Sequence, residues 1–382
     1  MPQLEFDIWG SIPFSQELTS DPIVQQILLA TRTKAMSLLE IANSIEADRR
    51  HVSQRIDELA RWDLLVADKS CPGRWVGNLP VYTAADMAVS EEIGSKYAKI
   101  EADILSSSLP SLQESYESCE ISRRFPWESM SLIVVGALLA DLCVYDRVRF
   151  FPQYLREDYL PPLHPDGRRW GYAGYERRRP RFPLRRLAFC QNLNLEESET
   201  GGLATFSYFD PPAERQAAPR SLFDQRLRSM VFCLAEARMS VREIAATTSV
   251  NAHDVQRTLE DWASYRPPAV CSQGKRYSLN IPVFPCSDLR RLLHLADAVA
   301  ETIHTEVTLP WHEERQETAE QMGLRFPLAE SHLARDMALQ VLVEEGRLSE
   351  VPDPPVPWSF GVWGWQGELP LWEDATREKE GT

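Results

Sequence analysis

The sequence predicts a mainly α, α+β fold in which one structural module occurs twice, and three observations predict it. A short motif and three further segments recur in the same order in the two halves of the chain. Apolar residues at helical spacing precede a β-hairpin signal in each half. A long helical stretch and a Pro- and aromatic-rich segment follow each hairpin. At 382 residues the chain has room for two or three domains with their own cores.

The internal repeat is clearest in residues 36–42, Met-Ser-Leu-Leu-Glu-Ile-Ala, and 239–245, Met-Ser-Val-Arg-Glu-Ile-Ala, which agree at five of seven positions. Three more matches follow in the same order: 78–82 with 280–284, Arg-Phe-Pro at 124–126 with the same triplet at 325–327, and 170–175 with 360–365. The offset between partners falls slowly, from 203 through 202 and 201 to 190. Four collinear matches indicate a tandem duplication.

Three short helices and a hairpin are expected between Ile23 and residue 77. Asp48 is a favourable N-cap for the third helix. A strand at 64–66, a turn at 71–74 and a returning strand at 75–77 form the hairpin. The apolar residues that set the helical spacing are Ile23, Ile27 and Leu28, then Leu38, Ile41, Ala42 and Ile45, then Val52, Ile56 and Leu59.

This pattern resembles the winged helix-turn-helix of ArsR- and MarR-type transcriptional regulators over about 60 residues of each half. In the first copy the resemblance is carried by Ile41, Ala42, Ile45, Asp48, Val52, Ser53, Ile56, Leu59, Leu64 and Leu65. In the second copy it is carried by Ile244, Ala245, Thr248, Asn251, Val255 and Leu259. The second copy departs from the pattern after Trp262, where 265–268 read Tyr-Arg-Pro-Pro. The resemblance implies a fold, tandem winged helices, but winged helices serve both as DNA readers and as protein-interaction modules.

A long helix is expected after each hairpin, at 84–106 and 287–305, with a second helical segment at 110–120 and 311–322. In winged-helix regulators such a helix often builds the dimer interface, so two copies on one chain could pair as a pseudo-dimer. Equally, each helix could cap only its own domain. The two interpretations stay open.

Each half ends in a further helix, at 128–145 and 328–345, and then in a segment rich in Pro and aromatic residues. Gly171 and Gly174, like Gly361 and Gly364, stand between aromatics, which suggests a strand or tight turn with rings packed over the backbone. A hydrophobic clasp closing each half is favoured over a ligand site.

The domain assignment is 1–120 for the first winged helix with its long helix, 121–200 for the segment closing the first half, 201–322 for the second winged helix with its long helix, and 323–382 for the last helix with the aromatic, acidic tail.

Candidate DNA contacts lie on the outward positions of the first copy's third helix and on its hairpin. A recognition helix presents its N-terminal side chains to base edges and phosphates. These positions hold Arg49, Arg50, Ser53, Gln54 and Arg55, and Lys69 and Arg74 stand near the tip of the hairpin. The alternative is that these basic residues only form a solvated face.

The corresponding positions of the second copy are poorer in cations: Ala252, His253, Gln256, Arg257 and Thr258. Asp254 would face phosphate unfavourably. The hairpin of the second copy carries Lys275 and Arg276. The second copy is therefore expected to bind DNA more weakly or to serve another purpose, with Arg257, Lys275 and Arg276 as its candidate contacts.

The charge distribution is uneven around a net charge of −15. Residues 147–190 hold eleven Arg and four acidic residues, a balance of +7, and residues 343–382 hold nine acidic and three basic residues, a balance of −6. In 168–186 arginines alternate with aromatics, a composition that nucleic-acid surfaces use. The same strip also suits a linker that docks onto the acidic second half. The acidic total argues against a protein that coats nucleic acid with its whole surface.

Signals for catalysis and metal binding are absent from the sequence. It contains no Gly-rich phosphate loop, no His-Glu-x-x-His, no Gly-x-Ser-x-Gly and no dinucleotide fingerprint. The seven cysteines form no Cys-x-x-Cys pair, which favours a reducing compartment, and the seven histidines show no ligand spacing. Cys71 and Cys271 both fall in hairpin regions, and inert thiols are favoured there over a thiol sensor. No cofactor and no metal are expected.

The sequence thus predicts a non-enzymatic, cytoplasmic DNA-binding transcription regulator built as a single-chain pseudo-dimer of winged helices, with double-stranded DNA as its partner. No secretion signal and no membrane span are expected. The alternative is a winged-helix adaptor that binds a protein partner, or a subunit of a larger complex.

Overall fold

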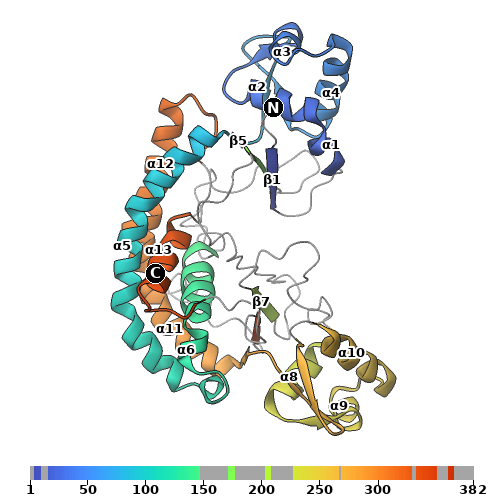
Figure 1. Cartoon of the computed structure of the whole chain (residues 1–382), viewed down its shortest axis with the longest axis vertical. Coiled ribbons are helices and arrows are strands. Elements are labelled where there is room, and N and C mark those ends of the chain that lie inside the picture. Colours follow the sequence, from blue (N-terminus) through green and yellow to red (C-terminus); the bar gives the residue numbers. More distant parts are fainter. Residues whose placement is uncertain are drawn as a thin grey trace, which may run out of the picture. The chain divides into compact units, whose positions relative to one another are not determined.

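The computed structural model describes residues 4–9, 16–146, 171–176, 203–207, 227–265, 268–328, 333–350 and 360–364. In these residues the chain is mainly helical, and its strands form small sheets of three strands each (Figure 1). The element order of the first half returns in the second half. None of the described helices is both long enough and apolar enough to cross a membrane.

The first half contains a unit of three helices and a hairpin, which we call module 1 (residues 22–77). Its elements are α2 (Pro22–Thr31), β2 (Met36–Ser37), α3 (Leu38–Ser44), α4 (Arg49–Arg61), β3 (Leu65–Ala67) and β4 (Arg74–Gly77), preceded by α1 (Gln16–Ser20). The strands are antiparallel, in the order β2-β4-β3. The core of module 1 consists of the side chains that the helical spacing selected, among them Ile27, Leu28, Ile41, Val52 and Leu59, all fully buried.

Module 2 (residues 228–279) repeats this order in the second half. Its elements are α8 (Arg228–Glu236), β8 (Met239–Ser240), α9 (Val241–Thr248), α10 (Ala252–Ser264), β9 (Val270–Gln273) and β10 (Arg276–Leu279), and its sheet order is β8-β10-β9. Met230, Ile244, Val255, Leu259 and Trp262 form its core. The departure after Trp262 lies at the end of α10, where Tyr265 leaves the helix in an extended conformation.

The repeated motif explains why each module starts its second helix where it does. In module 1 the Ser37 hydroxyl accepts from the Glu40 backbone N–H, and the Glu40 carboxylate accepts from the Ser37 N–H, a capping box. Ser240 and Glu243 form the same box in module 2. The hairpin turns also match, because Gly73 (φ +82°) and Gly274 (φ +66°) both adopt left-handed backbone that favours glycine.

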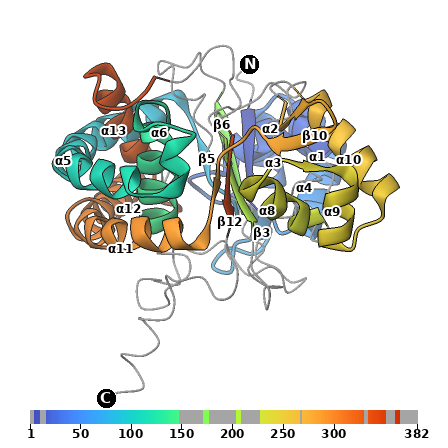
Figure 2. The same ribbon diagram turned by 90° about the horizontal axis from the view of Figure 1, so that it is seen from below.

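A second small sheet in each half joins its first and last strands. β6 (Gly171–Glu176) pairs antiparallel with β1 (Leu4–Trp9) and parallel with β5 (Val81–Tyr82), and Figure 2 shows β5 and β6 together. β12 (Phe360–Gly364) pairs in the same way with β7 (Leu203–Ser207) and β11 (Val283–Phe284). A Cβ added to Gly174 would lie 2.8 Å from the Phe6 ring, so this ring packs over the glycine backbone. The prediction of strands with rings over glycine is confirmed at Gly174.

The first long helix runs further than the sequence predicted. α5 (Ala84–Glu117) is continuous through Pro110, so the expected separate helix starting at residue 110 was wrong. Proline removes one helical hydrogen bond, which the flanking turns of a long packed helix can outweigh. In the second half Pro310 lies two residues after a π-helical turn (His304–Thr308) that joins α11 (Cys286–Ile303) to α12 (Leu309–Gln321).

The remaining described helices are a 3-10 turn (Glu120–Arg123), α6 (Trp127–Leu132), a π-helical stretch (Ile133–Asp146) and α13 (Leu333–Glu344). The chain forms two compact units. Unit 1 comprises Met1–Ala98, Val148–Arg181 and Thr305–Ala334, and unit 2 comprises Lys99–Arg147, Phe182–His304 and Arg335–Thr382. The four consecutive segments assigned from the sequence follow the order of the elements along the chain. Each compact unit, in contrast, contains segments from both halves of the sequence.

Candidate nucleic-acid interface

Helix α4 has one buried face and one exposed, cationic end. Val52, Ile56 and Leu59 are buried in module 1. The N-cap Asp48 accepts hydrogen bonds from the backbone N–H of Arg50 (2.9 Å) and His51 (3.2 Å), which fixes the first turn. Arg49, Arg50 and Gln54 are exposed, and Ser53 is half-buried. Arg50 and Gln54 lie four residues apart and therefore share one face of the helix.

Arg49 and Arg50 stand where a helix disfavours positive charge. The partial positive charge of a helix N-terminus favours acidic side chains in the first turn, yet α4 has none there. No ion pair to Arg49 or Arg50 is formed within the described part of the chain. The two guanidinium groups are thus placed at a local electrostatic cost, with their donors available to an external anion.

Arg55 is engaged inside module 1. Its guanidinium pairs with Asp21 at the start of α2 (2.6 Å) and with Glu58 on its own helix (2.7 Å). The hydrogen bond to Glu58, together with the charge of Asp21, raises the pKa of Arg55. Arg55 therefore fastens α4 to α2, and the structure separates it from the exposed pair Arg49 and Arg50.

Arg74 and Arg276 also hold internal partners, and each begins the second strand of its hairpin, just after the turn. Arg74 pairs with Glu40 (2.9 Å) and donates to the Ala35 carbonyl (2.9 Å). Arg276 pairs with Glu243 at the equivalent position of module 2. Both arginines thus tie the second hairpin strand to the capped start of α3 or α9. Lys69 and Lys275, in contrast, are exposed in the hairpin turns.

The capping-box glutamates are strongly acidic. Hydrogen bonds from Ser37, and then the nearby Arg74, lower the pKa of Glu40 to about 2. The same arrangement of Ser240 and Arg276 lowers the pKa of Glu243. Both carboxylates stay ionised in the folded chain and hold their arginines in place.

The first turn of α10 in module 2 differs from that of α4. Ala252 and His253 are exposed, and Asp254 follows them, an arrangement that suits the helix N-terminus. Arg257 lies 3.5 Å from Asp254, and Gln256 donates to Glu260 (2.6 Å). Thr258 is buried. The polar side chains of α10 therefore pair with one another, and the helix carries no exposed pair of cations at its start.

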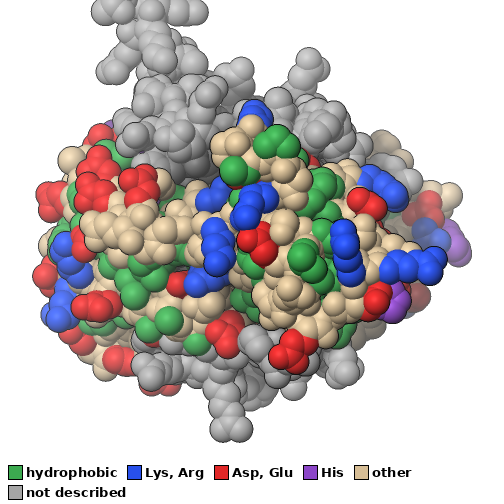
Figure 3. All heavy atoms as spheres, turned by 90° about the horizontal axis from the view of Figure 1, so that it is seen from above, with side chains coloured by type: hydrophobic (Ala, Val, Ile, Leu, Met, Phe, Trp, Pro, Cys, Tyr) green, Lys and Arg blue, Asp and Glu red, His purple; other side chains and the backbone are tan. Residues whose placement is uncertain are grey.

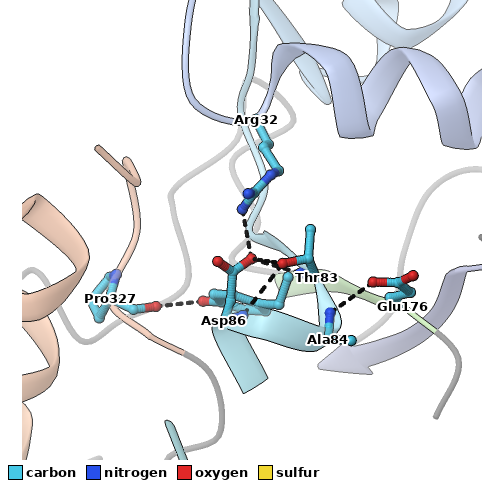
Figure 4. Close-up of polar contacts among 7 residues, drawn as sticks. Arg32, Thr83, Ala84, Asp86, Glu176 and Pro327 are labelled. Atoms are coloured by element: carbon cyan, nitrogen blue, oxygen red, sulfur yellow. Dashed lines mark hydrogen bonds and ion pairs between the residues drawn. The ribbon is translucent and has the colours of Figure 1, made fainter. Parts of the chain in front are cut away.

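A polar network at the start of α5, missed from the sequence, joins module 1 to the long helix (Figure 4). Buried Asp86 pairs with Arg32 at the end of α2 (2.6 Å) and accepts from the Thr83 backbone N–H (2.6 Å). Glu176 of β6 accepts from the Ala84 N–H (2.7 Å). No local motif signals this network, because its members come from three distant segments.

Lys and Arg side chains lie in separate groups on the face drawn in Figure 3, with acidic and neutral side chains between them. Of the basic strip, only 171–176 is described, and 168–170 and 177–186 lie outside the described residues, as does most of the acidic tail. The described residues contain no group of three His, Cys, Asp or Glu side chains that could hold a metal ion.

The cysteines of the hairpins differ in exposure from Cys119. Cys71 and Cys271 are exposed in the hairpins, and the Cys271 Sγ lies 3.2 Å from the Ser278 hydroxyl. Cys119 is buried, and burial beside Asp288 raises the pKa of its thiol to about 12. A thiol held in its protonated form is a poor nucleophile, so Cys119 is a packing residue.

The chain was compared with protein-family models, with curated proteins and with solved structures, and none of them matches it.

Proposed function

We propose that modules 1 and 2 are winged helices and that the protein is a DNA-binding transcription regulator in which one chain supplies both modules of a pseudo-dimer. In this function α4 is the recognition helix of module 1. Arg49 and Arg50 contact phosphate or guanine, and Gln54 faces a base edge. Lys69 contacts the sugar-phosphate backbone of the adjacent DNA.

The observation that carries the proposal is the pair Arg49 and Arg50 at the exposed first turn of α4. Cations at this end oppose the helix dipole, and neither arginine forms an ion pair within the described residues, since the carboxylate of the N-cap Asp48 accepts backbone N–H groups instead. The other arginines predicted at this site, Arg55 and Arg74, have two internal partners each. Residues that break a local stability rule without internal compensation are expected at functional sites, and here the missing partner is an anion.

The test is binding to a random-sequence duplex of about 30 base pairs, followed by fluorescence anisotropy at roughly 50 and 200 mM salt. Replacing Arg49 and Arg50 by Ala should weaken binding on the order of tenfold at low salt. Each lost phosphate contact removes about one unit from the slope of log affinity against log salt, so the double variant should lose about two.

A matched control is the double variant Arg61→Gln with Lys99→Gln, which removes two exposed cations outside the first turn of α4. This control should keep both the affinity and the slope. If the Arg49, Arg50 variant is folded and binds the duplex as tightly as the unmodified chain, α4 is not the DNA-reading helix.

A second candidate function, a protein-binding adaptor, is favoured by one observation, the first turn of α10. Its exposed residues are neutral or paired, and Asp254 would repel phosphate. If the unmodified chain fails to bind duplex DNA at low salt, the adaptor function replaces the regulator.

A further inference from the structure

In unit 1, module 1 is held by an arginine of the second half of the chain. The Arg325 guanidinium donates to the backbone carbonyl of Gly77 at 2.7 Å. Gly77 is buried and is the last residue of β4, the second hairpin strand of module 1. Arg325 follows α12 and begins the second Arg-Phe-Pro triplet.

In unit 2 the same contact occurs with the halves exchanged. Arg124, which begins the first Arg-Phe-Pro triplet, donates to the carbonyl of Leu279 at 2.6 Å. Leu279 is buried and is the last residue of β10, the second hairpin strand of module 2. Gly77 and Leu279 are 202 residues apart, and Arg124 and Arg325 are 201 apart, so both partners occupy equivalent places in the repeat. We call these two contacts the crossed clamps.

Other contacts across the halves accompany the clamp in unit 1. Tyr82 donates its hydroxyl to the Pro327 carbonyl at 2.5 Å, next to the network at the start of α5 (Figure 4). Glu314 of α12 accepts from Lys96 (2.5 Å) and from the Tyr97 hydroxyl (2.8 Å) of α5. Tyr82 and Tyr97 are buried, so their two hydroxyl bonds are partly sheltered from water, whereas the Lys96–Glu314 pair is exposed.

Unit 2 has its own set of contacts across the halves. Both carboxylate oxygens of buried Asp288 accept backbone N–H groups at the start of the 3-10 turn, from Glu120 (3.2 Å) and Ile121 (3.1 Å). Arg291 donates to the Ser118 carbonyl at 2.9 Å. A charged acceptor that takes up two N–H groups of a helical turn is a strong anchor.

From this reciprocity we infer that the two halves, 1–200 and 201–382, are interlocked by exchange of their helical segments. The segment after the long helix of one half is the docking surface for the module of the other half. The partner that this surface fits is therefore a second copy of the same half-chain fold, covalently linked or not. The inference goes beyond the proposed function and does not depend on DNA binding.

The experiment cuts the full-length chain between its halves. A site for a sequence-specific protease is inserted after Thr200, and the purified protein is cleaved under native conditions. We expect the two fragments to co-elute in size-exclusion chromatography at micromolar concentration and to separate only in denaturant. Fragments that elute separately under native conditions would overturn the inference.

The role of the crossed clamps is tested in the same cleaved protein. Replacing Arg124 and Arg325 by Met keeps a long apolar side chain and removes both charged donors. Dissociation of the fragments should become at least about tenfold more favourable, because hydrogen bonds from charged donors are roughly twice as strong as neutral ones. Circular dichroism of the uncleaved variant checks that it is folded.

The matched control replaces Arg123 and Arg242 by Met. Both are exposed arginines, and Arg123 is the sequence neighbour of Arg124. This control should leave the dissociation constant of the fragments unchanged. An unchanged dissociation constant in the folded Arg124, Arg325 variant would show that the clamps do not hold the halves together.

Discussion

Asp86 and Asp288 occupy the same place in the repeat, four residues after β5 and β11. Asp86 pairs with Arg32 of its own half, whereas Asp288 binds backbone N–H groups of the other half. The residue at the place of Arg32 in module 2 is Ala235, which cannot form the ion pair. The two equivalent aspartates therefore make different contacts, so residue identity within a repeat does not fix residue role.

The capping-box glutamate gives module 1 a defined response to acid. Glu40 has a pKa of about 2 in the folded chain, below its ordinary value of 4.5, because Ser37 and Arg74 favour the carboxylate. A lowered folded pKa stabilises the fold above the unfolded pKa, and this contribution disappears as the pH falls toward the folded pKa. The stabilisation by Glu40 is therefore complete above about pH 4.5 and is lost between about pH 4.5 and 2.

We predict that Glu40→Gln removes this part of the acid sensitivity. Urea unfolding followed from pH 2 to pH 7 should show a smaller loss of stability toward low pH than in the unmodified chain. At pH 7 the variant should be less stable, because the charged partner of Arg74 is gone. Glu92→Gln, an exposed change on α5, serves as the control and should keep the original pH profile. Identical profiles for Glu40→Gln and the unmodified chain would contradict the prediction.

At the scale of elements, the sequence predicts what is local. The three helices of module 1, their buried faces and the hairpin follow from apolar spacing, from Asp48 as N-cap and from the glycine at the turn. The prediction that a new helix starts at Pro110 was wrong. A proline in the sequence indicates the local loss of a helical hydrogen bond, but it does not show the packing of the helix that outweighs this loss.

The exchange between halves could not be predicted from the sequence. Periodicity shows which face of a helix is buried but not which segment buries it. The Arg-Phe-Pro repeat marked Arg124 and Arg325 as equivalent, yet nothing in the triplet shows that each binds the hairpin of the opposite half. Among the predicted site residues, the structure leaves Arg49, Arg50 and Gln54 exposed and engages Arg55 and Arg74 internally, because ion pairs between distant segments have no local signature.

The strand β6 offers a prediction about how tightly each half is closed. A Cβ at position 174 would lie 2.8 Å from the Phe6 ring of β1, closer than real Cβ contacts allow. Gly174→Ala should therefore destabilise the chain by about 1–3 kcal/mol through overpacking. The measurement is urea unfolding. Adding Phe6→Leu shortens the side chain and should recover part of the loss, so the two changes should be non-additive. Additive effects would show that the ring and the glycine do not meet.

At the scale of the whole molecule, charge is the property that most constrains the proposed DNA binding. A net charge of −15 repels a polyanion, so the proposed binding would depend on few cations, and module 1 has more of them at its helix start than module 2. The two modules share a fold and differ in surface, which is expected after a duplication that keeps the core and frees the exposed positions.

The acidic C-terminus contributes to the negative net charge and can be removed without changing either module. Residues 366–382 hold five acidic and two basic residues, so their deletion changes the net charge from −15 to −12 and spares the strand β12. We predict that the deletion raises affinity for duplex DNA about three- to tenfold at low salt, since it removes net negative charge that repels DNA and competes with DNA for basic side chains.

At high salt the deletion should change little, because a Debye length of about 3 Å at 1 M screens exposed charges from one another. Anisotropy titrations of one duplex at low and at high salt measure the affinity of each protein under both conditions. A full-length chain with the five acidic residues replaced by Gln and Asn separates charge from chain length, and it should behave like the deletion. If the shortened chain binds DNA no more tightly than the intact one at low salt, the C-terminus does not compete for the cations, and the +7 balance of 147–190 is better explained by a structural role of that segment.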